Sequence, residues 1–310
     1  MGEIKIFGGK YQPVLRKQIC QQLGIPRSTF KIEKYPNGCF EVFLQNDIKG
    51  CKAFLIQTSV SQTLHRDLWS LFQLVSAAKL NGASEITVII PYVSYARSDK
   101  KDKPGMTISG KLLAKLLKTS GITRFVGIDF HSNKFEKFFS KKTKVYHLSA
   151  LPLIVKYLKM EHLKNAILLP GDKGAFEKAS LVGKKLNIPV GSVDKTRING
   201  KKVKIEKITG KVAGKDVILF DDEISPAATT VTTLGKELEK RGAKSLTVVV
   251  THASIVRKTA RNLRKLKALK KIIITDTVPI SEEIKKSLPI EVLSVADLLA
   301  ETIKKISEED

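Results

Sequence analysis

The segment Val217-Ile-Leu-Phe-Asp-Asp-Glu-Ile-Ser-Pro-Ala-Ala-Thr-Thr230 decides the fold of this chain. Its first four residues are apolar, as in a buried parallel strand, and they end at the carboxylates of Asp221 and Asp222. A loop of small residues follows, and a helical pattern begins at Val231. Acids at the carboxyl end of a strand, before a loop that feeds a helix, lie where open α/β sheets bind ligands. The segment therefore predicts an α/β sheet with a binding site at this edge.

The chemistry of the same segment indicates a phosphorylated sugar as the ligand. The hydroxyl groups of Ser225, Thr229 and Thr230, together with backbone N–H groups at the helix start, suit a phosphate. Two adjacent carboxylates suit a sugar diol or a metal-bound substrate. The alternative is a helix cap beside a solvated acidic turn, because Ser and Thr before a helix are ordinary capping residues.

Composition places the chain among soluble globular proteins. With 310 residues, 42% hydrophobic and 27% charged, it has the length of two ordinary domains. No apolar run approaches the roughly 20 residues that span a bilayer, and the first residues do not resemble a signal peptide. The three cysteines are odd in number and lack CxxC spacing, which is typical of reduced thiols. We therefore expect a cytoplasmic protein with no membrane partner.

The net charge of +25 favours anionic ligands. Lysines are spread along the chain, however, and aromatic residues make up only 6% and do not interleave with basic ones as a stacking platform requires. The densest basic cluster, Arg257 to Lys271, is expected to be the solvated face of a helix with Leu263, Leu266 and Leu269 as its apolar stripe. Phosphate is thus a stronger inference than nucleic acid, and we expect no nucleic-acid partner.

Apolar runs alternate with helical patterns over most of the length, which indicates βαβ units and mostly parallel sheets. The predicted strands are 53–57, 86–90, 124–128, 144–147, 166–170, 189–193, 217–220, 246–250 and 271–275. The predicted helices lie near 12–23, 65–82, 107–119, 133–139, 151–159 and 173–186. Two such sets join near 146–152 and predict two similar doubly wound domains. The segment Thr196–Gly214 interrupts the rhythm, and its Asn199-Gly200 turn signal predicts a β-flap in the second domain.

A basic loop follows the predicted strand 86–90. Arg97 within Pro91–Gly105 would clamp a polyphosphate, because guanidinium matches phosphate oxygens bidentately; the alternative is a mobile surface loop. The stretch Gly105–Lys111 has the spacing of a nucleotide P-loop. Leu112 stands where that motif needs a hydroxyl, and no strand precedes it, so we reject the P-loop.

Polar residues end two further predicted strands. Asp129 and His131 follow strand 124–128, and Asp172 follows strand 166–170. Together they would hold Mg²⁺ on a polyphosphate, although a lone histidine is more often structural and an aspartate before a helix is often a cap. The other histidines have no ligand spacing and are expected to be structural or solvated: His65, His147, His162 and His252.

Lys195 and Arg197 stand at alternate positions where the flap begins. In an extended segment alternate residues share one face. Two cations on one arm would close over a phosphate and stabilise transferring charge, or they are surface cations of a basic chain.

Taken together, the residues resemble the ribose-phosphate pyrophosphokinase (phosphoribosyl-pyrophosphate synthetase) family. The motifs that carry the resemblance run along almost the entire chain and keep their order: Phe7-Gly-Gly9, Pro91–Arg97, Asp99–Gly105, Asp129–His131, Pro170–Gly174, Asp194–Arg197, Asp221-Asp222, Thr251–Ala253, Val278–Glu283 and Val292–Ala300. The resemblance implies two phosphoribosyltransferase-like α/β domains, 1–148 and 149–290, with segment 291–310 completing the first. It also implies transfer of the diphosphoryl group of ATP to the anomeric hydroxyl of ribose 5-phosphate, with Mg²⁺ as cofactor.

The resemblance also implies a role for each matching site residue. The ribose 5-phosphate would be bound by Asp221, Asp222, Ser225, Ala227, Ala228 and Thr229. The metal would be held by His131 and Asp172, and the transferring phosphates would be covered by Lys195 and Arg197. ATP would be contacted by Arg97, Ser98, Tyr35 and Asn37. Because the last two would reach the nucleotide of a neighbouring subunit, the active unit would be an oligomer, typically a hexamer built from dimers.

Several residues depart from the family pattern. The phosphate loop usually reads Asp/Ser-Thr-Gly-Gly-Thr, whereas here Pro226 lacks one N–H donor and Ala227 and Ala228 replace glycines and would resist positive φ. Ser98 replaces a glutamine and Cys39 a glutamate, which puts regulation by ADP and phosphate in doubt. The altered loop motivates one alternative, a non-catalytic regulatory homologue that assembles with an active synthetase. A phosphoribosyltransferase would need only one such domain, and the two-domain length and the cationic arm speak against it.

Overall fold

A computed structural model describes residues 3–9, 12–58, 63–198 and 202–309, and the side chains of residues 197, 198 and 202 lie outside the description. The chain forms two compact units, and each is described by itself. Unit 1 comprises residues 1–149 and 294–310, and unit 2 comprises residues 150–293. Both contain a five-stranded sheet in which every neighbouring pair of strands is parallel. The predicted α/β class with two parallel-sheet domains is confirmed.

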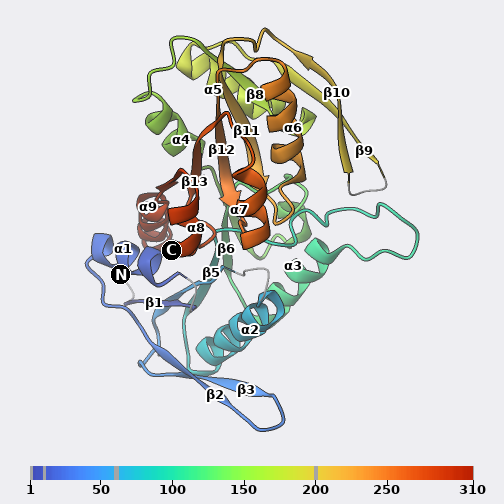
Figure 1. The fold of residues 1–310 in the computed structure, drawn as a ribbon. Helices are drawn as coiled ribbons and strands as arrows, with labels where there is room; N and C mark the ends of the chain where they lie inside the picture. Colours follow the sequence, from blue (N-terminus) through green and yellow to red (C-terminus); the bar gives the residue numbers. More distant parts are fainter. Residues whose placement is uncertain (1–2, 10–11, 59–62, 199–201, 310) are drawn as a thin grey trace. The chain divides into compact units, whose positions relative to one another are not determined.

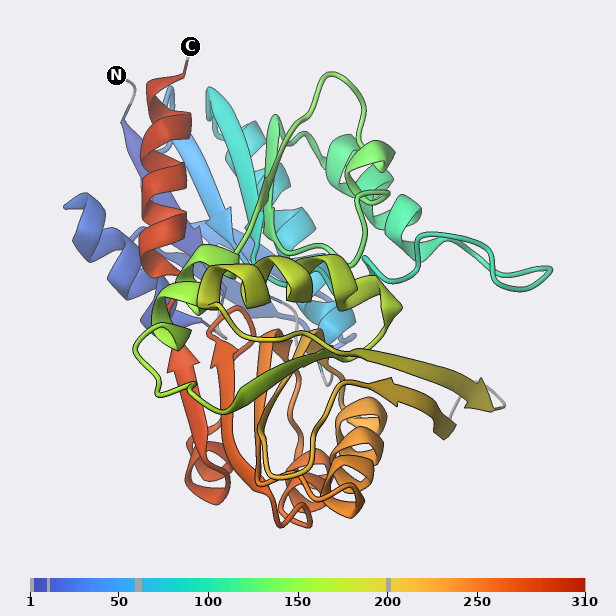
Figure 2. The ribbon, with the colours of Figure 1, turned by 90° about the horizontal axis from the view of Figure 1, so that it is seen from above.

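The sheet of unit 1 has the strand order β1-β4-β5-β6-β7 (Figure 1). Its strands are β1 (Ile4–Gly8), β4 (Lys52–Ile56), β5 (Glu85–Ile90), β6 (Arg124–Ile128) and β7 (Lys144–Leu148). The helices are α1 (Pro13–Leu23), α2 (Leu64–Leu80), α3 (Ser109–Ser120) and α9 (Ala296–Glu308). Helix α1 packs against α9, and α2 packs against α3 and the sheet (Figures 1 and 2). The helix from the end of the chain is therefore part of the first unit.

A separate hairpin, β2 (Phe30–Lys34) and β3 (Phe40–Leu44), was not predicted and projects from unit 1 (Figure 1). Strand β3 packs on α2, where Gln73 Nε2 donates to the Phe40 carbonyl at 2.7 Å. None of the residues in β2 and β3 is fully buried, and the partly buried Phe30, Val42 and Leu44 pack against the core of unit 1. The hairpin therefore depends on the rest of unit 1 for its apolar contacts.

The sheet of unit 2 has the order β14-β13-β12-β11-β8. Its strands are β8 (Ala166–Pro170), β11 (Asp216–Ile224), β12 (Ser245–Ala253), β13 (Leu269–Thr275) and β14 (Ile290–Leu293). One face buries a cluster shared with α6 (Thr229–Lys240), α7 (Arg257–Leu263) and α8 (Glu282–Ser287). On the other face lie α4 (Leu151–Leu158) and α5 (Phe176–Leu186), which follows the 3₁₀ turn η2 (Lys173–Ala175) (Figure 2).

The predicted flap is an antiparallel hairpin of β9 (Ser192–Ile198) and β10 (Lys202–Thr209) that packs along α6 (Figure 1). It begins earlier than expected, because residues 192–198 continue as one strand. The strand predicted at 189–193 starts too early, because β9 begins only at Ser192 and Val190 makes an isolated bridge with Leu168. The Asn199-Gly200 turn lies outside the described residues.

Two predicted helices are corrected. The expected helix at 133–139 is only the 3₁₀ turn η1 (Glu136–Phe138), because Phe135 and Phe139 both pack into an aromatic cluster around Phe125. The expected helix face from Arg257 to Lys271 ends with α7 at Leu263. Leu266 is buried in the following turn, and Leu269 begins β13.

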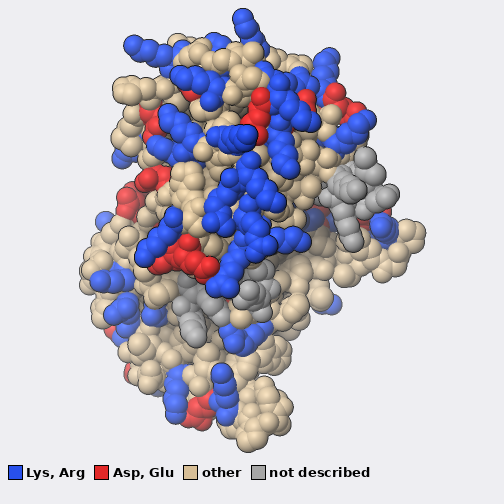
Figure 3. Space-filling model, viewed as in Figure 1, with Lys and Arg blue, Asp and Glu red and all other residues tan. Residues whose placement is uncertain are grey.

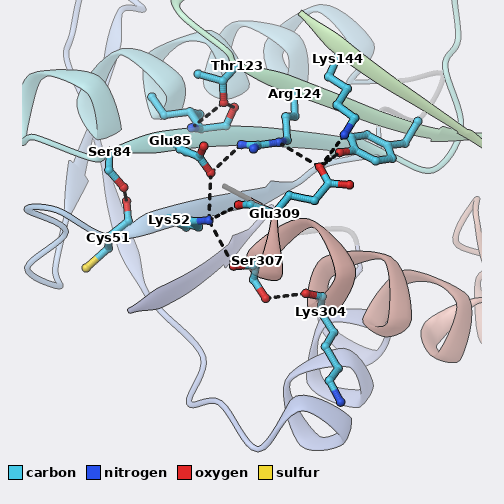
Figure 4. Close-up of polar contacts among 12 residues, drawn as sticks. Cys51, Lys52, Ser84, Glu85, Thr123, Arg124, Lys144, Lys304, Ser307 and Glu309 are labelled. Carbon is cyan, nitrogen blue, oxygen red and sulfur yellow. Dashed lines mark hydrogen bonds and ion pairs between the residues drawn. The ribbon is translucent and has the colours of Figure 1, made fainter. Parts of the chain in front are cut away.

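A charged cluster ties the end of α9 to the sheet of unit 1 (Figure 4). Arg124 Nη1 lies 2.5 Å from Glu85 Oε2, and its Nε lies 3.9 Å from Glu309 Oε2. Glu309 also accepts hydrogen bonds from Lys144, at 2.7 Å, and from the Tyr146 hydroxyl. These hydrogen bonds lower the pKa of Glu309. The cluster fastens the last turn of the chain to β6 and β7.

Replacing Arg124 with methionine is expected to lower the free energy of unfolding by about 1–3 kcal/mol. The arginine side chain is only 9% exposed, and its loss leaves two carboxylates without this cation. Arg257→Met is the control, because its ion pair with Glu283 is 80% and 63% exposed and its loss should leave the denaturation midpoint unchanged. Equal midpoints for both variants in chemical denaturation would show that the cluster contributes nothing.

Among the described residues, no helix is both long and apolar enough to cross a membrane. Lysine and arginine side chains outnumber acidic ones on the face shown in Figure 3, as the composition predicts.

Candidate functional site

The carboxyl end of β8 presents Asp172. The strand is buried along its whole length, and after Gly171 the Asp172 carboxylate accepts a hydrogen bond from Ala175 N–H at 3.0 Å, which caps η2. Asp172 thus caps a helical turn, which was one of the two roles considered for it. The second oxygen, Oδ2, lies 3.4 Å from Lys195 Nζ, so the same carboxylate also takes part in a charged site.

Asp221 and Asp222 lie within the neighbouring strand rather than after it. The strand was predicted to stop at Phe220, but β11 continues to Ile224 because it stays paired with β12. Asp221 is buried, at 7% exposure, and its Oδ1 accepts from Asp222 N–H at 2.8 Å. Gly171 leaves room for it, since a Cβ at that position would lie 2.0 Å from Asp221 Oδ2.

Burial raises the pKa of Asp221 well above its usual value, and the negative charges of Asp222 and Asp172 raise it further. Lys195 opposes this effect by stabilising the ionised form. A second cation near these carboxylates, such as a bound metal ion, would act on the pKa of Asp221 in the same direction as Lys195.

Lys195 is the cation that contacts both Asp172 and the start of α6. It lies on β9, its side chain is only 10% exposed, and its Nζ lies 3.3 Å from Thr230 Oγ1 as well as near Asp172. It thus connects the end of β8 with the first turn of α6. Arg197 lies two residues further along β9, where its backbone pairs with Val203, and its side chain is outside the description.

The loop between β11 and α6 contains a turn. Ala228 N–H donates to the Ser225 carbonyl at 2.9 Å, and Ala228 itself has φ +46°. Ala228 thus adopts the positive φ that a residue with a Cβ was expected to resist, and its methyl group is buried in the core of unit 2. Ala227 is exposed and is not among the described residues with positive φ.

Helix α6 begins at Thr229 without a side-chain cap. The first N–H groups of a helix have no intrahelical partner, and they carry the positive end of the helix dipole. The half-buried side chains of Ser225, Thr229 and Thr230 border this helix start. The predicted sugar-phosphate residues are thus brought together with Asp172 and Lys195 in one unit.

The remaining predicted residues lie in unit 1. Arg97 is exposed in the loop after β5, and Ser98 Oγ accepts from Ser109 N–H at 3.1 Å at the start of α3. His131 is exposed, three residues after β6. Tyr35 and Asn37 form the tip of the β2–β3 hairpin, where Tyr35 is 40% exposed.

Three of the other histidines make hydrogen bonds. His147 accepts from Phe130 N–H at 2.9 Å and so supports the chain just before His131. His65 contacts the Tyr95 hydroxyl, and His252 contacts Thr277, both at 2.9 Å. His252 is buried, His147 is partly buried, and His65 and His162 are exposed, in line with the structural or solvated roles expected for them.

Two residues near the site were missed in the sequence. Gly171 stands inside the Pro170–Gly174 motif, which predicted no role for it, and its role follows only from its proximity to Asp221. Thr259, on α7, donates a hydrogen bond to the Pro226 carbonyl from 33 residues away. No local pattern reveals a contact of that separation.

Within the described parts of the chain, no three His, Cys, Asp or Glu side chains are grouped so as to hold a metal ion. Magnesium commonly uses only one or two protein carboxylates, with waters and substrate phosphates as its other ligands. Asp172, at 38% side-chain exposure, has the chemistry for one such contact.

Comparison with known proteins identifies the family. A family model described as the N-terminal domain of ribose phosphate pyrophosphokinase matches residues 4–121, and one described as the phosphoribosyl synthetase-associated domain matches residues 164–310. The ribose-phosphate pyrophosphokinase of Porphyromonas gingivalis is 32% identical over 97% of this chain and 94% of its own. That of Haemophilus influenzae is 33% identical over 100% and 98%.

A solved structure is similar over nearly the full length. The crystal structure of phosphoribosylpyrophosphate synthetase from Mycobacterium smegmatis matches with a TM-score of 0.90 and 30% identity, covering 99% of each chain. The resemblance predicted from the motifs is confirmed, and the chain belongs to the ribose-phosphate pyrophosphokinase family.

Proposed function

We propose that the chain transfers the diphosphoryl group of ATP to ribose 5-phosphate. The anomeric hydroxyl oxygen attacks the β-phosphorus, the bond from that phosphorus to the α,β-bridging oxygen breaks, and AMP leaves as phosphoribosyl diphosphate forms. The hydroxyl proton passes to solvent. The observation that carries the proposal is Lys195, which bridges Asp172 and Thr230 beside the buried Asp221.

The roles of the site residues follow from this reaction. Asp221 and Asp222 accept hydrogen bonds from the ribose hydroxyls. The 5-phosphate is bound by the start of α6 and by the loop residues Ser225, Ala227, Ala228 and Thr229. Lys195 and Arg197 bind the transferring phosphates, since such transfer needs cations and positioning rather than a covalent nucleophile.

The nucleotide is assigned to residues of unit 1. Arg97 and Ser98 contact ATP, and Tyr35 and Asn37 reach the nucleotide of a neighbouring subunit in a hexamer built from dimers. The exposed hairpin tip supports this assignment, because its side chains are available to a second copy. The functional domains are taken to be 1–148, completed by 291–310, and 149–290.

Magnesium is the proposed cofactor, with His131 and Asp172 as its protein ligands. When bound, the ion neutralises charge on the β- and γ-phosphate oxygens. Lys195 orients Asp172 through its contact with Oδ2. The three cysteines are free thiols, which supports a cytoplasmic location.

The altered phosphate loop was the reason for the regulatory alternative. Ala228 reaches positive φ without a glycine, and the first turn of α6 has no side-chain cap that competes with a ligand. Both observations support the catalytic assignment.

The reaction is tested by incubating the purified chain with ATP, Mg²⁺ and ribose 5-phosphate and measuring AMP. AMP should appear only when all three are present, with phosphoribosyl diphosphate formed in equal amount. AMP release at the same rate without ribose 5-phosphate, or none at all, would refute the proposal. In the second case, co-purification with an active synthetase would favour the regulatory alternative.

A further inference from the structure

The phosphate loop of this chain, residues 225–228, is held from outside by a side chain of another helix. Within the loop, the hydrogen bond from Ala228 N–H to the Ser225 carbonyl closes a four-residue turn. Pro226 occupies the second position of that turn, where its fixed φ is favourable. Pro226 is exposed as a residue, and its carbonyl takes no part in this turn bond. The hydrogen-bond partner of that carbonyl lies outside the loop.

Thr259 supplies that partner. It lies on α7, is 0% exposed, and its hydroxyl donates to the Pro226 carbonyl. A threonine within a helix ordinarily bonds its own helix's preceding carbonyls. This one instead connects α7 to the loop that precedes α6.

Ala228 gives the contact its importance. Its φ of +46° is unfavourable for a residue with a Cβ, so the surroundings must hold it there. Its methyl group is 2% exposed and belongs to the same buried cluster as Val231 and Leu234 of α6. The turn is therefore anchored at Ala228 by the core and at Pro226 by Thr259.

We propose that Thr259 is a positioning residue for substrate phosphate: it fixes the loop so that the free N–H groups at the start of α6 keep one direction. The identity of the ligand as ribose 5-phosphate rests on the proposed function, whereas the fixing of the loop does not. Thr259 acts through Pro226 and does not contact the substrate itself.

The test compares Thr259→Val with Thr259→Ser. Valine keeps the shape and removes the hydroxyl, whereas serine keeps the hydroxyl. In the valine variant the KM for ribose 5-phosphate should rise by about fivefold to tenfold, while kcat and the KM for ATP stay within about twofold. The serine variant should match the wild type in all three constants. A KM for ribose 5-phosphate that is unchanged by valine, or raised equally by serine, overturns the proposal.

Hydrogen exchange tests the fixing of the loop without any ligand. The Ala228 amide, which closes the turn, should exchange about fivefold to tenfold faster in the valine variant than in the wild type or the serine variant. Amides of Val248 and Val249, buried in the centre of β12, should be unaffected. Unchanged Ala228 exchange refutes the inference even in an active enzyme. Faster exchange in a chain that releases no AMP upholds the positioning of the loop and refutes only the proposed reaction.

Discussion

Replacement of Lys195 by alanine is expected to lower the rate of AMP formation by about 100- to 1,000-fold, the loss typical when one preorganised group that stabilises transferring charge is removed. The ammonium group is 10% exposed and lies 3.4 Å from Asp172 and 3.3 Å from Thr230. Its removal takes away the cation that connects the ends of β8 and α6. It also removes the charge that opposes the raised pKa of Asp221.

Lys173→Ala is the matched control for this experiment. Lys173 is a lysine of the same site region, but its side chain is 83% exposed and pairs with Asp194 at 3.2 Å on the surface. Exposed ion pairs contribute little, so its loss should change the rate by less than about twofold. If Lys195→Ala keeps more than a tenth of the wild-type rate, or if both variants lose activity equally, Lys195 has no special role.

The buried strands could be predicted from the sequence because their signal is local. Strands 124–128 and 166–170 were predicted with the bounds that the structure shows, since each is an apolar run closed by polar residues. Strand β11 was predicted too short because carboxylates are rare inside strands, and only its pairing with β12 carries it past Asp221. The β2–β3 hairpin was missed because its apolar face is completed by α2, which is distant in the sequence.

The sequence predicted which residues belong to the candidate site, but it did not predict the contacts between them. The motifs placed Asp172 and Asp221 at strand ends and Lys195 at the start of the flap. The structure adds that Lys195 Nζ lies 3.4 Å from Asp172 Oδ2 and that its charge acts on Asp221. Ala228 has positive φ although its intrinsic preference, a local property, opposes that conformation. The buried methyl group and the anchored turn are tertiary effects that override it.

The second large effect is expected for Gly171→Ala, which should lower kcat/KM for ribose 5-phosphate by about 30- to 100-fold, as expected for a misplaced catalytic-site group. The new Cβ would lie 2.0 Å from Asp221 Oδ2 and 2.5 Å from its Cγ. Asp221 is buried within β11 and has little room to rotate away. Its carboxylate must therefore leave the position from which it would accept the ribose hydroxyls, and the KM for ATP should change much less.

Two further variants show whether the Asp221 carboxylate is the cause. Gly174→Ala should have a smaller effect, because its Cβ would meet only Asp172 Oδ1, at 3.2 Å. Adding Asp221→Ala to Gly171→Ala removes the two closest contacts, with Oδ2 and Cγ, and leaves only the contact with the Cβ of residue 221 at 3.0 Å. The double variant should therefore unfold at a higher denaturant concentration than Gly171→Ala alone. The activity losses of the two substitutions should then be far from additive, since both disable the same carboxylate. Additive losses, or an unchanged affinity for ribose 5-phosphate in Gly171→Ala, would mean that Asp221 does not bind the sugar from the position that Gly171 leaves open.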